Sequence, residues 1–85
     1  MQRDLCGHST APFAGSADDF LRLGLSCTTG AGSPVDLVAA HKWFNLAAMH
    51  GNKDAVRWRR EIAAEMTVAE ITTAQRAARD WITRH

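Results

Sequence analysis

The segment 37–48 carries apolar side chains at intervals of three and four residues, and this spacing is the strongest constraint on the fold. Leu37, Ala40, Phe44 and Ala47 recur as they would along one face of an α-helix. No segment of the chain shows the alternation of apolar and polar residues that is typical of a β-strand. The sequence therefore predicts an all-α protein.

Cap and turn residues divide the chain into helices. Ser16 is a good N-cap for a first helix, and Gly51 is typical of a residue that ends one. Thr67 and Glu70 have the spacing of a capping box, in which each side chain bonds the backbone N–H of the other residue. The predicted helices are 17–28, 36–50, 53–65 and 68–83.

The start of the second predicted helix admits two N-caps. Ser33 could occupy that position with Pro34 as the first helical residue, or Asp36 could occupy it. Gly30 and Gly32 precede both and allow a tight reversal of the chain. The sequence leaves both caps open.

Length and charge limit the classes of function. With 85 residues the chain makes one small domain, in which we expect a flexible tail over 1–16 and a helical domain over 17–85. The net charge of +1 does not call for a polyanionic partner. The two cysteines do not make a disulfide framework. We find no signal peptide and no apolar run long enough to span a membrane, so we predict a cytoplasmic protein.

Small residues, glycines and aromatics recur along the chain in the order and spacing of a Sel1-like repeat, a relative of the tetratricopeptide repeats. The match covers roughly 17–58, which is one unit and the start of a second. The resemblance implies a right-handed solenoid of antiparallel helix pairs that serves as an adaptor. The matching positions are Leu23, Gly24, Gly30, Gly32, Asp36, Ala40, Trp43, Phe44, Ala47, Ala48, Gly51 and Ala55.

Each of these residue types has a physical use in such a repeat. Gly24 and Ala40 lack bulk, so the two helices of a pair can approach closely. Large aromatics fill the space that the small residues leave. The repeat degenerates after Ala55, because Arg59 and Arg60 stand where Leu and Gly are expected. We therefore interpret the third and fourth helices as a C-terminal cap that completes a short solenoid of two helix pairs.

A second apolar line on the first helix suggests a binding surface. Leu21 and Leu25 lie four residues apart, outside the main apolar face. In the repeat register they align with Arg57 and Glu61, which we expect to be solvated. We predict that these four residues bind another protein or a second copy of the chain. The alternative is that residues 1–16 fold back and cover the two leucines.

The residue types that catalysis or metal binding would use are present but poorly placed. His41 and His50 are nine residues apart on one helix, so they lie on opposite faces and cannot hold one ion. Cys27 could meet His41 across the first hairpin, but a packed thiol is the simpler interpretation. No metal-binding or nucleophile motif occurs. We predict no cofactor, no metal and no enzyme activity.

The predicted function is therefore protein–protein interaction or scaffolding. The alternative is contact with nucleic acid through Lys53, Arg57 and Arg60, which follow helical spacing on the third helix. Asp54 and Glu61 intersperse that positive charge and make the alternative the weaker one. A small hydrolase is weaker still, because no catalytic constellation supports it.

Overall fold

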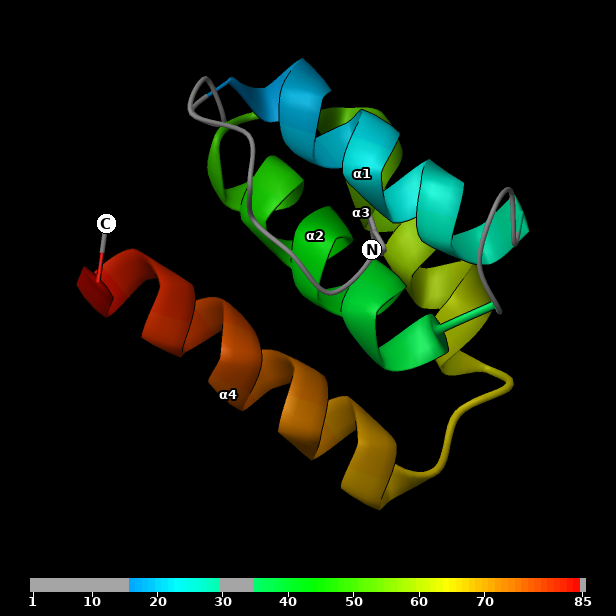
Figure 1. Ribbon diagram of the computed structural model, residues 1–85. Coiled ribbons are helices and arrows are strands. Elements are labelled where there is room, and N and C mark those ends of the chain that lie inside the picture. The colour runs from blue at the N-terminus through cyan, green and yellow to red at the C-terminus, as the bar shows by residue number, and fades with distance from the viewer. Residues whose placement is uncertain (1–15, 30–34, 85) are drawn as a thin grey trace, which may run out of the picture.

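The computed structural model describes residues 16–29 and 35–84, which form four α-helices (Figure 1). They are α1 (Ala17–Thr29), α2 (Leu37–Met49), α3 (Lys53–Ala63) and α4 (Val68–Arg84). Each helix begins and ends within two residues of the predicted position, and the described ranges contain no strand. The all-α prediction is confirmed. The predicted tail up to residue 15 and the predicted reversal at Gly30 and Gly32 lie outside the described residues.

Side-chain caps fix the starts of α1 and α2. The hydroxyl of Ser16 accepts a hydrogen bond from the backbone N–H of Asp19 at 3.0 Å. The carboxylate of Asp36 accepts one from the N–H of Ala39, also at 3.0 Å. Asp36 is thus the N-cap of α2. These bonds satisfy amides that have no partner within their own helix.

The turn between α2 and α3 is closed by backbone bonds around a glycine. Gly51 has a φ of 100°, a conformation that favours glycine. Its N–H donates to the carbonyl of Ala48, and the N–H of Asn52 donates to the carbonyl of Ala47, both at 3.0 Å. The side chain of Asn52 then caps α3 by accepting from Ala55 N–H at 2.9 Å. One residue thus closes one helix and opens the next.

The predicted capping box begins α4. The carboxylate of Glu70 accepts from the N–H of Thr67 at 2.8 Å, and the hydroxyl of Thr67 accepts from the N–H of Glu70 at 3.1 Å. The two bonds hold the chain entering α4 in a defined direction. This prediction is confirmed.

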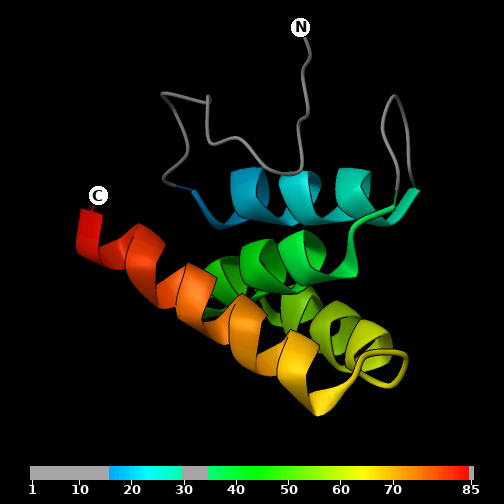
Figure 2. The same cartoon turned by 60° about the horizontal axis from the view of Figure 1, so that its bottom comes forward.

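Helix α2 is the centre of the fold, because α1, α3 and α4 all pack against it (Figures 1 and 2). A helix covered on several sides needs apolar residues nearly all round. Seven of the thirteen residues of α2 are buried. Trp43 is fully buried in the core. Its burial is completed by α4, whose Trp81 packs on the Trp43 ring.

The approach of α1 to α2 depends on Gly24. This residue is buried, and a Cβ atom added to it would lie 2.5 Å from Cδ1 of Phe44. Phe20 and Cys27 lie on the same face of α1 and are also buried. The ring of Phe44 therefore occupies the place that a side chain at position 24 would take.

Helix α4 docks on α2 through small residues and one tryptophan. Ala74 and Ala78 are buried at the contact. The ring of Trp81 packs edge-on against Trp43 and Phe20, with centroid separations of 5.3 and 6.2 Å. The expected second antiparallel pair is therefore not the main packing arrangement, because α3 and α4 each pack principally against α2.

Some large apolar side chains remain on the surface. Ile82 follows Ala74 and Ala78 at helical spacing, yet it is 43% exposed. Met49, Val35 and Val68 are exposed as well. Within residues 16–29 and 35–84, no helix has both the length and the apolar character needed to cross a bilayer.

Replacing Gly24 with alanine should lower the free energy of unfolding. Alanine usually stabilises a helix interior relative to glycine by about 0.5–1 kcal/mol. Here the added methyl group collides with Phe44, and overpacking of this kind costs about 1–3 kcal/mol. We expect a net loss of about 1 kcal/mol or more, measured by urea unfolding followed by tryptophan fluorescence.

The control is the same substitution in a Phe44→Leu background, where the smaller side chain removes the collision. There Gly24→Ala should cost less, and the difference measures the coupling of the two positions. An increase in stability for Gly24→Ala alone would show that Gly24 is not needed for the close approach.

Candidate functional site

The predicted partner surface begins on one side of α1. Leu21 and Leu25 are half-buried there and pack against the core. Asp18 shares this side of the helix, and its carboxylate accepts a hydrogen bond from Nδ2 of Asn52 at 3.2 Å. Because Asn52 caps α3, this side of α1 is turned toward α3. The leucines therefore line the side of α1 that faces α3, with part of each side chain accessible.

The predicted members of this surface on α3 are exposed. Arg57 lies 3.8 Å from Asp54 in an ion pair whose side chains are both 69% exposed, and such pairs contribute little to stability. Glu61 is also exposed. Lys53 and Arg60 are exposed too, and helical spacing puts them beside Arg57 on the outer face of α3. The three basic residues that could contact nucleic acid therefore lie on one face of α3, with the carboxylate of Asp54 beside them.

The repeat-structural residues lie where close helix packing needs them. Six of the twelve are buried in the core, and Leu23 and Ala48 are half-buried against it. Asp36 and Gly51 are exposed at helix boundaries, and Gly30 and Gly32 lie outside the described residues. The buried members are Gly24, Ala40, Trp43, Phe44, Ala47 and Ala55.

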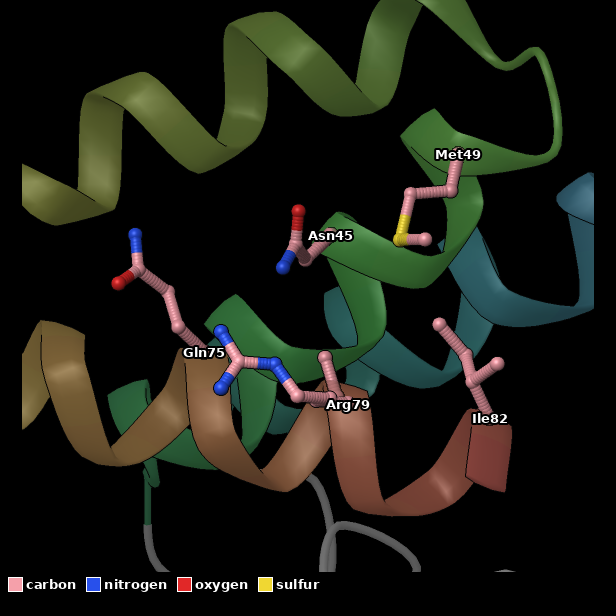
Figure 3. Close-up of a pocket in the computed structure, with 6 residues that line it drawn as sticks. Asn45, Met49, Gln75, Arg79 and Ile82 are labelled. Atoms are coloured by element: carbon pink, nitrogen blue, oxygen red, sulfur yellow. The ribbon is translucent and has the colours of Figure 1, made fainter. Parts of the chain in front are cut away.

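A hollow that the sequence did not predict lies over α2 and against α4, with the ribbon of α3 on the side opposite α4 (Figure 3). The residues that line it come from α2 and α4. We call it the α3–α4 groove. Its volume is about 400 Å³, which is within the range of ligand-binding pockets. Helix α2 supplies its floor and α4 one wall. The residues that line it are Asn45, Met49, Gln75, Ala78, Arg79 and Ile82.

Asn45 lies on the floor of the α3–α4 groove. Its Oδ1 accepts a hydrogen bond of 2.6 Å from Nη1 of Arg59 on α3. In Figure 3 the amide oxygen points toward α3, whereas the amide nitrogen faces the groove. Gln75 and Arg79 reach into the same space from α4. The floor of the groove on α2 and its wall on α4 therefore present N–H donors.

One end of the α3–α4 groove is apolar. Met49 from α2 and Ile82 from α4 lie at this end in Figure 3. Met49 is 59% exposed and Ile82 is 43% exposed. Apolar side chains left accessible beside polar groups are typical of a surface that another molecule covers.

His41 lies one helical turn before Asn45 on the same face of α2. It is only 3% exposed, and its Nδ1 atom has no hydrogen-bond partner among the described residues. Burial, and then the positive charge of Arg59, lower the pKa of His41 below its ordinary value of 6.5. The ring is therefore neutral at pH 7.

The other chemically reactive side chains are occupied by packing or by local bonds. Cys27 has no exposed surface, so a substrate could reach its thiol only if α1 and α2 separated. Nδ1 of His50 lies 2.8 Å from the carbonyl oxygen of Leu46. In the part of the chain that the structure describes, no cluster of three or more His, Cys, Asp or Glu residues is placed to hold a metal ion.

Sequence reasoning missed the α3–α4 groove because its residues are not neighbours in the sequence. The only local signals were the apolar residues Met49 and Ile82 at the edges of helix faces. Ile82 has a spacing from Ala74 and Ala78 that is typical of a core residue and does not indicate a surface position. Its partial exposure depends on the angle at which α4 crosses α2, which spacing along one helix does not contain.

The lowered pKa of His41 predicts a loss of stability in mild acid. The unfolded chain binds a proton at this side chain near pH 6.5, whereas the folded chain does so only at lower pH. The contribution of His41 to the free energy of unfolding should therefore be constant above pH 6.5, and it should fall as the pH is lowered through that value. Urea unfolding between about pH 7.5 and about pH 5.5 measures this, above the range where most carboxylates titrate.

His41→Gln should flatten that pH dependence, whereas His50→Gln, at an exposed position, should leave the His41 contribution in place. If His41→Gln and the unmodified chain lose stability equally over this interval, the buried imidazole is not the cause.

No family model, curated protein or solved structure matches this chain. The resemblance to Sel1-like repeats therefore stays a prediction from the sequence. The function has to be argued from the two surfaces described above.

Proposed function

We propose that this protein is a binding module that docks a segment of another protein in the α3–α4 groove and catalyses no reaction. The observation that carries the proposal is the groove itself, where exposed Met49 and Ile82 lie beside the polar side chains of Asn45, Gln75 and Arg79. Protein-binding sites combine an accessible apolar anchor with nearby polar groups that orient the partner.

The rigidity of the groove supports this function. Its floor is α2, which the other three helices hold in place. The bond from Arg59 to Asn45 fixes two of the polar side chains before any partner arrives. A site that is already ordered loses less conformational entropy when it binds. A larger part of the free energy of the partner's contacts would therefore contribute to binding affinity.

The proposal includes the repeat architecture that the sequence suggested. In that arrangement α1 and α2 are the helix pair of one Sel1-like unit, α3 begins a second unit and α4 closes the stack. The close contact of Gly24 with α2 and the glycine turn at Gly51 support it. We place the function in the cytoplasm, where a thiol such as Cys27 stays reduced.

A double variant, Met49→Ser with Ile82→Ser, tests the proposed docking site. Both side chains are exposed, so the free energy of unfolding should change by no more than about 0.5 kcal/mol per position. Loss of an apolar anchor should weaken partner binding by roughly tenfold or more. The measurement is quantitative mass spectrometry of proteins retained by the immobilised chain, followed by titration of each retained protein.

Val68→Ser is the matched control. Val68 is 82% exposed, is also on α4 and lies outside the groove. The proposal fails if the double variant retains every partner with unchanged affinity, or if Val68→Ser weakens binding equally.

The surface formed by Leu21, Leu25, Arg57 and Glu61 is the second candidate for partner contact or self-association. Leu21→Ser with Leu25→Ser should lower the free energy of unfolding by about 2 kcal/mol, because both leucines pack against the core. Arg57→Ala with Glu61→Ala should leave stability nearly unchanged, because both side chains are exposed. Urea unfolding and light scattering measure stability and self-association.

The variant Arg57→Ala with Glu61→Ala distinguishes a role in binding from a role in packing on this surface. If it weakens a partner or shifts the oligomeric state, the surface binds. If only the leucine pair has an effect, and that effect is on stability alone, the leucines are core residues. Contact with nucleic acid through Lys53, Arg57 and Arg60 would instead show affinity that falls steeply with salt.

A further inference from the structure

The α3–α4 groove carries an excess of hydrogen-bond donors. Arg79 lines the groove and contributes a guanidinium group, which has donors and no acceptor. The guanidinium of Arg59 is bonded to Asn45 on the floor and is the second such group near it. The amide nitrogen of Asn45 faces the same space, and Gln75 adds a second amide. The oxygen of Asn45 is already used by Arg59. A ligand that complements this set must therefore supply acceptors.

The carboxylates of α3 lie away from the groove. At ~100° per residue, Glu61 is about 200° around α3 from Arg59. Asp54 is about 140° from Arg59 in the other direction and pairs with Arg57 on the outer face.

The carboxylates of α4 lie away from the groove as well. Asp80 is about 140° around the helix from Gln75. Glu70 is held in the capping box at the start of the helix. None of the residues that line the groove is acidic, and in the described part of the chain neither Arg59 nor Arg79 forms an ion pair. The lining of the groove therefore carries the positive charge of Arg79 and no negative charge.

The imidazole of His41, one helical turn from Asn45, adds no charge to the groove. His41 is buried next to Asn45 on α2 and is neutral at pH 7. Asn45 and Gln75 are neutral too. A bound carboxylate would thus meet the guanidinium of Arg79, with the guanidinium of Arg59 bonded to Asn45 on the floor. Charge-assisted hydrogen bonds are stronger in a partly enclosed site than at an open surface.

Apolar and cationic groups share the groove in a fixed order. Met49 and Ile82 lie at one end, whereas Asn45, Gln75 and Arg79 lie toward the other (Figure 3). A volume of about 400 Å³ holds a few side chains and not a whole helix. The complementary ligand is short and places an apolar side chain beside an acidic one.

We propose that the partner segment that docks in the α3–α4 groove is an acidic peptide in which an Asp or Glu lies next to a large apolar residue. The inference rests on the proposed docking function and names its ligand chemistry. The carboxylate binds Arg59 and Arg79, and the apolar side chain packs on Met49 and Ile82. The amides of Asn45 and Gln75 bond the peptide backbone or the second carboxylate oxygen.

The test begins with a library of random short peptides displayed on phage and selected on the immobilised full chain. Selected peptides should be enriched in Asp or Glu adjacent to Leu, Ile, Met or Phe. A fluorescein-labelled peptide from the selection is then titrated and followed by fluorescence anisotropy. The isosteric peptide with Asn or Gln in place of the acid should bind roughly tenfold more weakly or worse, because a charge-assisted bond is lost.

Variants of the chain locate the contact. Arg79→Gln should weaken the acidic peptide by roughly tenfold while leaving the Asn or Gln peptide nearly unaffected. Arg57→Gln removes the same charge from the outer face of α3 and should have little effect. Arg59→Gln should act like Arg79→Gln, and circular dichroism with urea unfolding checks that loss of its bond to Asn45 leaves the fold intact. Amide shifts in NMR spectra should map to Asn45, Gln75 and Arg79.

Three outcomes would overturn the proposal. The selection could show no enrichment of acidic residues, the isosteric peptide could bind as tightly as the acidic one, or Arg79→Gln could behave like Arg57→Gln. Tighter binding of an oligothymidylate probe at the same residues, with steep salt dependence, would also overturn it by assigning the arginines to phosphate. A second copy of the chain as occupant would appear as a dimer that Arg79→Gln dissociates, with no binding of the selected peptides.

The docking function and the acidic chemistry can fail separately. If Met49→Ser with Ile82→Ser abolishes partner binding but Arg79→Gln does not, the groove binds a partner that is not acidic. If neither variant has any effect on a retained partner, the docking function itself is wrong.

Discussion

The burial of α2 between three other helices is the constraint on which the rest of the structure depends. A helix in this position must be apolar on most of its surface, yet its neighbours can approach only where side chains are small. The sequence meets both demands with large aromatics and alanines on α2, and with Gly24 on α1 facing the ring of Phe44. Because α2 is held from several directions, the positions of α1, α3 and α4 are fixed relative to one another.

The α3–α4 groove is a consequence of that arrangement. Three helices around a fourth leave one strip of the central helix uncovered, and on α2 this strip contains Asn45 and Met49. A polar residue is tolerated there because Arg59 satisfies its amide oxygen and the groove admits water to the rest. His41, one turn earlier, is covered, and its Nδ1 atom has no hydrogen-bond partner within residues 16–29 and 35–84. The burial of polar groups therefore changes sharply along one face of a single helix.

The two candidate surfaces differ in how well the sequence could find them. Leu21 and Leu25 stand out because they fall outside the apolar face of their own helix, which is a local signal. The structure adds that both are half-buried against the core. The groove residues carry almost no local signal, since Gln75 and Arg79 look like ordinary solvated positions of an amphipathic helix. They become a site only because α4 lies beside α2 with α3 on the other side.

The sequence by itself determined the four helices and the caps at Ser16 and Thr67. These features depend on contacts between residues three or four positions apart, such as Ser16 with Asp19 or Thr67 with Glu70, and local spacing is enough to predict such contacts. Only the tertiary structure decided that α4 packs on α2 and which edge residues stay exposed. That choice rests on rings far apart in the chain, Phe20, Trp43 and Trp81, whose contacts depend on the crossing angles of helices and not on the periodicity of any one of them.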